Sequence, residues 1–349
     1  MTPRQPPTKR PLGRTGLSIA PLVFGGNVFG WTADEATSFA LLDAFVEAGF
    51  DAVDTADVYS AWAPGNSGGE SETIIGRWMK ARGARSKITL ITKVGSPMGD
   101  GKKGLSARYI AEAVEASLKR LGTDVIDIYY LHKEDHGTPL EETVRALGDL
   151  IRQGKIRHYG VSNHRSWRVA EICNLADRMG IDRPVVSQPY YNAMNRMPEV
   201  EHLPACGFYG LGVVPYSPLA RGILSGKYDP KAPPPEGSRA GRADSRMMQT
   251  EWRKESLVIA QKLKAHAEKR GITPGQFATA WVLNNAFVTA AIAGPRTMEQ
   301  FEDYLGAPGY AFTKADEALV DRLVPAGHPS TPGYTDPAYP LEGRVSRCG

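Results

Sequence analysis

Residues 50–59 read FDAVDTADVY, an apolar run that ends in two acids and a tyrosine. This stretch predicts a buried β-strand at 51–55, with Asp54 at its end and Tyr59 a few residues beyond. Three later runs, ITLITKV, VIDIYYLH and IRHYGVSN, end in the same way, with the polar residues Lys93, His132, Ser162 and Asn163. The chain therefore repeats one pattern, a buried strand that closes on polar side chains.

Strands and helices alternate along the whole chain. Helix signals include capping boxes at 32–35 and 138–141 and glycine terminators such as Gly83 and Gly122. The predicted strands lie at 22–26, 51–55, 88–94, 125–131, 156–161, 184–188, 212–216 and 288–293. The predicted helices lie at 32–49, 70–82, 106–121, 138–154, 166–179, 198–208, 252–270, 273–284, 297–305 and 313–323.

Strands that alternate with helices and are nearly continuously apolar are typical of a parallel sheet covered on both faces. The pattern predicts an α/β fold, a single parallel (β/α)8 TIM barrel. The competing fold is an open dinucleotide-binding sheet, which requires a GxGxxG motif directly after an early strand. No such match exists, since Gly207, Gly210 and Gly212 have the wrong spacing.

Three further segments complete the predicted architecture. A turn at 13–16 between short β-prone runs predicts an N-terminal hairpin. Residues 219–250 are rich in Gly, Ser, Arg and Pro, and a loop of this length is usually functional, so we interpret it as a flap over a cofactor. We expect one domain over 1–349, with extended tails at 1–8 and about 325–349.

Composition and charge are those of an ordinary globular enzyme. Of the 349 residues, 42% are hydrophobic and 23% charged, so a large core can form without a special crosslink. The formal net charge of +4 is small, and basic residues are interleaved with acids. Nucleic acid is therefore not an expected partner.

Cysteine usage and the first residues bear on the location of the protein. Cys173, Cys206 and Cys348 are far apart and have no metal-ligand spacing, so we expect reduced thiols and no metal site. The opening MTPRQPPTKRP lacks an apolar signal segment, and no run of about 18 apolar residues occurs. We expect a soluble cytoplasmic protein that has no membrane segment.

The strand ends predict a site for proton transfer. Taken singly, each residue has an ordinary structural explanation: a loop cap for Asp54, a packing aromatic for Tyr59, a solvated charge for Lys93 and a core histidine for His132. Together they resemble a proton-transfer site. The Lys93 cation is expected to lower the pKa of Tyr59, Asp54 to orient the ammonium group, and His132 to hydrogen-bond a substrate oxygen.

These residues stand within a longer resemblance to the aldo-keto reductases. It is carried by LGRTGLSI, the Asp54-x4-Tyr59 pair, TKVG, YYLHKED, QGKIRHYGVSN, SQPYYN, YSPLARGILSGKY and IAGPRTMEQFEDYLGA. The resemblance implies a nicotinamide-dependent carbonyl reductase on a (β/α)8 barrel. In it Tyr59 is the general acid, supported by Asp54, Lys93 and His132.

The same resemblance implies the cofactor site. Ser162, Asn163 and Gln188 would hold the nicotinamide carboxamide, while Tyr216 would stack on the ring. The residues implied along the pyrophosphate are Ser217, Pro218, Leu219, Arg221 and Gly222. Those implied around the adenosine end are Lys227, Arg239, Gly294, Arg296 and Gln300.

Details at the adenosine end predict which cofactor is used. Arg296 stands just beyond the eighth strand and could grip a ribose 2′-phosphate, which predicts NADPH over NADH. Gln300 has an alternative role, because 297–300 is itself a capping box. Tyr304 departs from the family, whose members often carry an asparagine that contacts adenine at this position.

The substrate and the partner leave more than one interpretation open. Phe29, Trp31 and Trp62 are expected to line the mouth of the site and to favour apolar or planar carbonyl compounds, although ordinary surface aromatics are an alternative. The segment GKYDPKAPPPEGSRA resembles the subgroup that includes potassium-channel β subunits. A cofactor-binding regulatory subunit with negligible turnover is therefore the alternative to an enzyme that reduces a small-molecule carbonyl.

Overall fold

The computed structural model describes residues 6–99 and 101–339, and the chain divides into two compact units. Unit 1 comprises Met1–Tyr190, Glu201–Tyr216 and Asn285–Glu302, apart from the residues not described. Unit 2 comprises Tyr191–Val200, Ser217–Asn284 and Asp303–Gly349, with the same exception. One domain over 1–349 stays a prediction.

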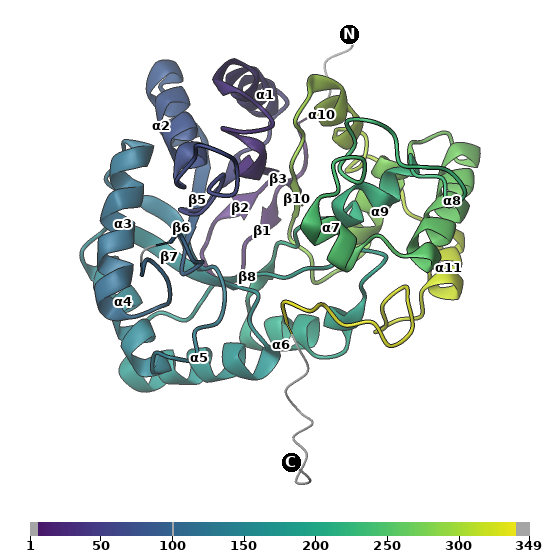
Figure 1. Ribbon diagram of the computed structural model, residues 1–349. Helices are drawn as coiled ribbons and strands as arrows, with labels where there is room; N and C mark the ends of the chain where they lie inside the picture. The colour runs from purple at the N-terminus through teal and green to yellow at the C-terminus, as the bar shows by residue number, and fades with distance from the viewer. Residues whose placement is uncertain (1–5, 100, 340–349) are drawn as a thin grey trace. The chain divides into compact units, whose positions relative to one another are not determined.

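Unit 1 is built on an eight-stranded parallel sheet (Figure 1). In spatial order the strands are β10 (Ala291–Ala293), β3 (Leu22–Gly25), β4 (Ala52–Asp54), β5 (Thr89–Val94), β6 (Ile126–Leu131), β7 (Ile156–Ser162), β8 (Val186–Gln188) and β9 (Gly212–Val213). The two edges meet, because Thr289 N donates to Val213 O at 2.8 Å and Ile292 N donates to Pro215 O at 2.9 Å. The sheet is thus a closed cylinder, and the predicted (β/α)8 barrel is confirmed.

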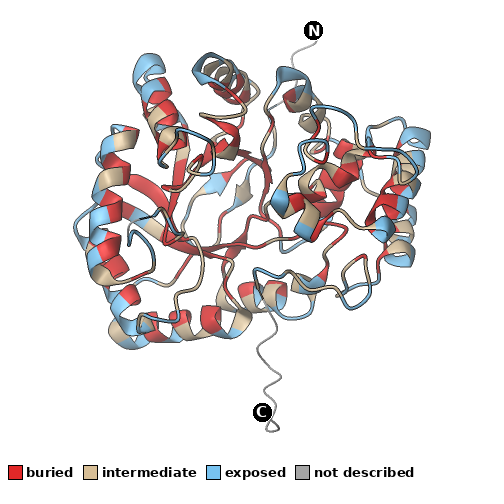
Figure 2. Cartoon of the chain, viewed as in Figure 1, coloured by how far each residue is buried: buried red, intermediate tan, exposed pale blue. Residues whose placement is uncertain are grey.

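Helices surround the strands of unit 1 (Figure 1). They are α1 (Glu35–Glu47), α2 (Glu70–Arg82), α3 (Ala107–Leu121), α4 (Leu140–Arg152), α5 (Ser166–Met179) and α6 (His202–Tyr209), and α10 (Met298–Tyr304) follows β10. On α3 the predicted apolar stripe is buried, from Ile110 through Val114 to Leu121. Figure 2 shows the same division on the neighbouring helices, with buried faces toward the strands and exposed faces outward.

The predicted N-terminal hairpin is confirmed as β1 (Arg10–Pro11) paired antiparallel with β2 (Ser18–Ile19). Its turn packs closely on the barrel. Gly13 has φ +56°, and a Cβ there would come within 2.1 Å of Val185 O, so only glycine fits. Leu12 beside it is fully buried in the barrel core, and the hairpin therefore contributes to that core.

Unit 2 is helical. It contains the 3₁₀ segments η3 (Met197–Glu199) and η4 (Ala220–Ser225) and the helices α7 (Ser245–Thr250), α8 (Lys254–Lys269), α9 (Pro274–Asn284) and α11 (Lys314–Leu323). The structure places η4 and α7 inside the predicted loop 219–250. It also packs residues 325–339, the described part of the predicted tail. Arg196 N donates to His328 O, Ser330 N donates to Met194 O, and Arg246 pairs with Asp336.

Two helix starts differ from the predicted capping boxes. α1 is capped by Asp34, whose side chain accepts from Thr37 N, while the hydroxyl of Thr32 donates to Val28 O. α4 has Pro139 as its N-cap residue, and no side chain caps it. The Thr138 hydroxyl instead donates to the Asp135 carboxylate at 2.7 Å. A hydrogen bond to a charged carboxylate is stronger than one between neutral groups, so the hydroxyl is turned toward Asp135 and not toward the start of the helix.

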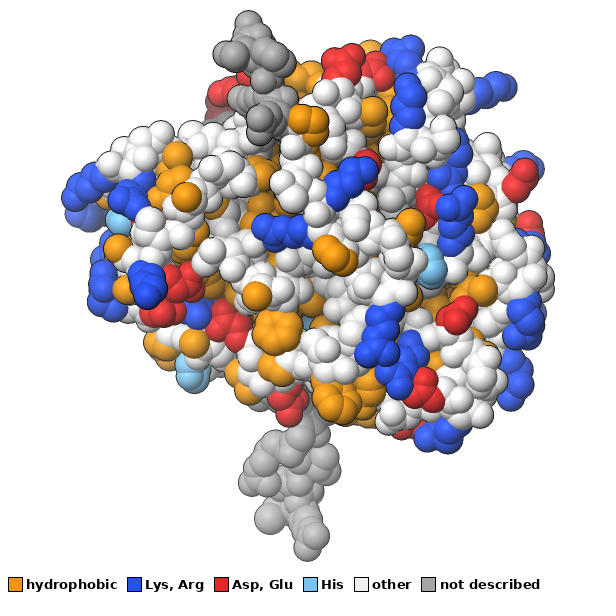
Figure 3. Space-filling model, turned by 180° about the vertical axis from the view of Figure 1, so that it is seen from behind, with side chains coloured by type: hydrophobic (Ala, Val, Ile, Leu, Met, Phe, Trp, Pro, Cys, Tyr) orange, Lys and Arg blue, Asp and Glu red, His pale blue; other side chains and the backbone are white. Residues whose placement is uncertain are grey.

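The structure also bears on the expectations for the cysteines, for membrane-spanning helices and for the surface charge. Cys173 and Cys206 are buried free thiols, whereas Cys348 lies outside the described residues. Across the described ranges no helix combines the length and apolar character needed to cross a bilayer, and a cytoplasmic location stays a prediction. On the face drawn in Figure 3, Lys and Arg side chains are scattered, with Asp and Glu among them.

Candidate active site

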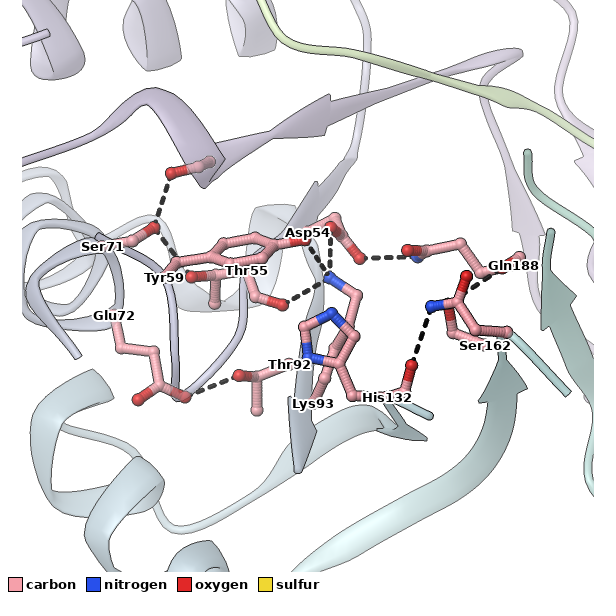
Figure 4. A network of polar contacts seen from close by, with 12 residues as sticks. Asp54, Thr55, Tyr59, Ser71, Glu72, Thr92, Lys93, His132, Ser162 and Gln188 are labelled. Atoms are coloured by element: carbon pink, nitrogen blue, oxygen red, sulfur yellow. Dashed lines mark hydrogen bonds and ion pairs between the residues drawn. The ribbon is translucent and has the colours of Figure 1, made fainter. Parts of the chain in front are cut away.

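Three strands of the barrel bring the predicted catalytic residues together. Asp54 ends β4, Lys93 lies on β5, and His132 directly follows β6. Lys93 Nζ donates three hydrogen bonds: to Asp54 Oδ2 at 2.6 Å, to Thr55 O at 2.7 Å and to Tyr59 Oη at 2.8 Å (Figure 4). All three ammonium protons therefore have acceptors, which fixes the Lys93 head group.

The Asp54–Lys93 ion pair is buried completely, with side-chain exposures of 1% and 0%. Burial raises the pKa of Asp54 and lowers the pKa of Lys93, because each charge loses its hydration. The opposite charge of the partner offsets part of both effects. Gln188 adds a hydrogen bond from Nε2 to the second Asp54 oxygen at 2.9 Å, so both oxygens of the carboxylate are satisfied.

The protonation of Tyr59 differs from the prediction. Burial raises the pKa of Tyr59 well above 10, and the nearby Asp54 raises it further. The expected lowering is therefore wrong for this structure, since burial and the nearby groups, Asp54 foremost, all act to raise the pKa of Tyr59. Tyr59 keeps its proton at neutral pH, which makes it a donor.

His132 is a neutral imidazole beside Tyr59. Burial, followed by the nearby charges of Lys93 and Lys133, holds the pKa of His132 well below its usual range. Its ring meets the Tyr59 ring edge to face, with centroids 5.8 Å apart. His132 therefore adds a hydrogen-bonding group next to the tyrosine without adding a charge.

The residues predicted to hold the nicotinamide are tied to the same cluster. Asn163 donates from Nδ2 to His132 O at 2.9 Å and accepts from the Tyr216 hydroxyl at 2.9 Å. The Ser162 hydroxyl donates to the backbone oxygen of Gln188 at 2.9 Å. Unit 1 thus gathers these four side chains near the ends of β7, β8 and β9, and through Gln188 they reach Asp54.

In unit 2, the predicted pyrophosphate segment has an unusual backbone. Ser217, Arg221 and Gly222 have φ of 56°, 53° and 102°. Left-handed residues other than glycine are strained, and they cluster at ligand-binding loops. Asn192 holds this segment by donating from Nδ2 to Ser217 O at 3.0 Å. Pro218 is buried and Leu219 partly so.

The predicted adenosine-end residues have defined surroundings. In unit 2, Arg239 pairs with Asp244 at 3.2 Å, and Lys227 lies over the Tyr228 ring, 5.2 Å from its centroid. In unit 1, Gly294 follows β10.

The capping role predicted for Gln300 is present at the start of α10. Its backbone N donates to Thr297 Oγ1, and its side-chain oxygen accepts from Arg296 N at 3.1 Å. Gln300 is thereby in use as a structural residue.

The three predicted wall aromatics are not equivalent. Trp62 is 51% exposed, and its ring lies edge to face with Trp31 at 5.7 Å and with Tyr59 at 6.1 Å. Phe29 is completely buried and stacks on Phe24 at 5.2 Å. It is a buried core residue, so the expectation that it lines the mouth of the site is wrong, while a ligand-facing role for Trp31 and Trp62 stays a prediction.

Sequence reasoning missed the polar side chains that surround the cluster. Thr55, Ser71, Glu72 and Thr92 are all fully buried and hydrogen-bonded beside the ion pair. In the sequence they are ordinary strand and helix residues. Only the contiguity of Ser71 and Glu72 at a helix start, a favourable place for acids and hydroxyls, could have drawn attention to them.

Comparisons with known proteins agree with this geometry. The Aldo/keto reductase family pattern matches residues 21–325. An uncharacterized oxidoreductase, YrpG, of Bacillus subtilis is 35% identical over 92% of this chain and 97% of its own. A probable voltage-gated potassium channel subunit beta of Arabidopsis thaliana is 35% identical over 85% and 89%, and the human aldo-keto reductase family 7 member A3 is 35% identical over 88% and 93%. On the extent of these matches, the chain belongs to the aldo/keto reductase family.

Proposed function

We propose that this protein reduces an aldehyde or ketone to an alcohol with NADPH, and that Tyr59 donates the proton. The observation that carries this is the hydrogen bond from buried Lys93 Nζ to Tyr59 at 2.8 Å. Membership of the aldo/keto reductase family supports an oxidoreductase, and the proposal adds the cofactor, the substrate class and the role of each residue.

The polar groups of unit 1 suit a nicotinamide. Asn163 and Gln188 offer amides, which match a carboxamide in donors and acceptors, and Tyr216 offers a flat ring for stacking. The bound cofactor supplies a hydride to the carbonyl carbon.

The protein's own residues handle the proton. His132 and Tyr59 hydrogen-bond the carbonyl oxygen, and the Tyr59 proton moves to that oxygen as negative charge develops on it. Lys93, held by Asp54, stabilises the phenolate that Tyr59 becomes. Trp31 and Trp62 form the apolar wall beside the substrate.

A second function follows from three relatives that are named as voltage-gated potassium channel subunits beta. The similarity to a potassium channel subunit beta favours a regulatory subunit that binds the cofactor and hardly turns over. The two functions differ in turnover, not in cofactor binding.

Steady-state assays of the purified protein separate them. A panel of aromatic, aliphatic and sugar carbonyls is followed by the loss of reduced-nicotinamide absorbance. If the protein is an enzyme, we expect sustained turnover, within the ordinary range of about 1 to 10³ s⁻¹, for at least one aromatic or apolar compound. Tight NADPH binding without turnover on any of them supports the regulatory subunit. A strong preference for small charged aldehydes contradicts the aromatic wall.

A further inference from the structure

Two residues at the start of α2 reach the strands that carry the ion pair (Figure 4). The Ser71 hydroxyl donates to Gly26 O at 2.7 Å and is 2.8 Å from the Thr55 hydroxyl, which must then be the donor between them. Glu72 accepts from the Thr92 hydroxyl at 2.5 Å and from Arg120 Nε at 2.6 Å. We refer to Ser71 and Glu72 as the α2 clamp.

The α2 clamp acts next to the reactive groups. Thr55 follows Asp54, and its backbone oxygen accepts from Lys93 Nζ. Thr92 immediately precedes Lys93 on β5, and side chains on a strand point alternately to opposite faces. Thr92 therefore faces the helices while Lys93 faces Asp54 inside the barrel. Each strand is held from outside at the residue beside its catalytic group.

Burial makes this arrangement specific. The clamp residues and their threonine partners are completely inaccessible to solvent, so water cannot replace a lost hydrogen bond. The Glu72 carboxylate is held by Thr92 on one oxygen and by Arg120 on the other. Glu72 on α2 therefore connects Thr92 on β5 with Arg120 on α3, which fixes the position of β5 relative to both helices.

We propose that Glu72 is a positioning residue for Lys93, acting through Thr92, and that the α2 clamp sets the distance from Lys93 Nζ to Tyr59. The proposal rests on the proposed function, in which Lys93 supports the proton donor. Misplacing a catalytic group by about 1 Å can lower the rate roughly 10²-fold. Loss of the Thr92 hydrogen bond should therefore lower kcat and leave KM nearly unchanged.

Two substitutions of Thr92 distinguish positioning from packing. Thr92→Val keeps the branched shape and removes the hydroxyl, whereas Thr92→Ser keeps the hydroxyl and removes a methyl group. Positioning predicts that T92V lowers kcat about 10- to 100-fold, with KM and the Kd of NADPH within about twofold, while T92S stays close to wild type. If packing alone matters, T92S is at least as impaired as T92V, and the proposal is overturned.

A matched control accounts for general loss of stability. Thr143, on α4, is also fully buried, and its hydroxyl donates to Leu105 O at 2.9 Å. Thr143→Val should lower the melting temperature as T92V does and leave kcat near that of wild type. An equal drop in kcat for both valine variants contradicts the proposal.

Crystal structures give a readout that does not depend on turnover. In T92V the separation of Lys93 Nζ and Tyr59 Oη should exceed hydrogen-bonding range, and in T92S it should stay near the 2.8 Å of the unaltered chain. An unchanged separation in T92V overturns the positioning role whatever the wild-type activity. Absence of carbonyl reduction by the wild type itself refutes the proposed function instead.

Discussion

At the residue scale, Glu251 is a buried acid that no role in the active site explains. It follows α7 in unit 2, and neither carboxylate oxygen has a hydrogen-bond partner among the described residues. Burial raises the pKa of Glu251 to about 7, against the opposing charge of Arg253. A raised pKa means that the folded state favours the protonated acid.

This pKa makes the stability of the protein depend on pH. The folded pKa of about 7 lies above the unfolded value. The stability that the folded state gains from protonated Glu251, relative to the ionised form, is therefore fully present at pH 4 and is lost as pH rises through 7. Glu251→Gln removes the ionisation. The variant should be more stable than wild type by roughly 3 kcal/mol at pH 8 and nearly equal to it at pH 4.

Urea unfolding at the two pH values measures this difference. Glu268→Gln, an exposed change on α8, serves as the control and should shift neither value. A Glu251→Gln variant that gains no stability at pH 8 would show that Glu251 is not buried as an unpaired carboxylate.

Residue types were predictable from the sequence, whereas their partners were not. The spacing of Asp54, Tyr59, Lys93 and His132 after apolar runs identified the polar cluster. The bond from Gln188 to Asp54 joins positions 134 apart, and nothing local to either residue signals it. The pKa of Tyr59 was predicted with the wrong sign because the sequence gives the nearby charges but not the loss of water.

At the element scale, α2 and α3 approach each other closely at Gly76 in unit 1. A Cβ on Gly76 would come within 2.4 Å of Arg120 O and 2.8 Å of Leu121 O, both backbone atoms. In an open helix Gly→Ala stabilises by about 1 kcal/mol. Here the backbone of α3 cannot move aside easily, so the two helices would have to separate.

Gly76→Ala should therefore destabilise the protein, by roughly 1 to 3 kcal/mol, as expected for overpacking. Gly148→Ala on α4 is the matched control, because its new methyl would meet only side-chain atoms of Ile181, at 3.0 to 3.1 Å. Thermal unfolding of both variants tests the packing. Equal melting temperatures for the two would contradict the close approach of α2 and α3.

Element boundaries were harder to predict than elements. The range predicted for α5 agrees with Ser166–Met179, because its periodicity and glycine stop are local signals. The start of α4 was misplaced because Asp135, outside the helix, takes the Thr138 hydroxyl. α7 was missed in a segment read as loop, since six residues are too short for a helical period to show.

At the scale of the whole molecule, the order of strands and helices was enough to predict the barrel. Eight apolar runs separated by helices leave few ways to bury both faces of a parallel sheet. The packing of 325–339 in unit 2 was not predictable, because single hydrogen bonds such as that from Ser330 to Met194 hold it, with no amphipathic pattern.

Cofactor binding should stabilise the whole folded chain. A ligand that binds only the native state adds about 2.7 kcal/mol at 100 times its Kd. NADPH should raise the melting temperature more than NADH at equal concentration, since Arg296 can pair with the 2′-phosphate through charge-assisted bonds.

Arg296→Ala tests the source of this preference. The substitution should weaken NADPH binding about 10- to 100-fold and leave the Kd of NADH within about twofold, because NADH lacks the 2′-phosphate. Isothermal titration of both cofactors provides the numbers. Equal weakening of the two, or a wild-type preference for NADH, would contradict the role of Arg296.

The central claim is that Tyr59 donates the proton while Lys93 holds the Tyr59 hydroxyl in place. The most direct measurement is the single-turnover rate of carbonyl reduction by wild type and Tyr59→Phe, with NADPH binding measured alongside. The account predicts that Tyr59→Phe binds NADPH with nearly unchanged Kd and loses a factor of about 10² to 10⁴ or more in rate. Reduction by Tyr59→Phe at close to the wild-type rate would contradict it.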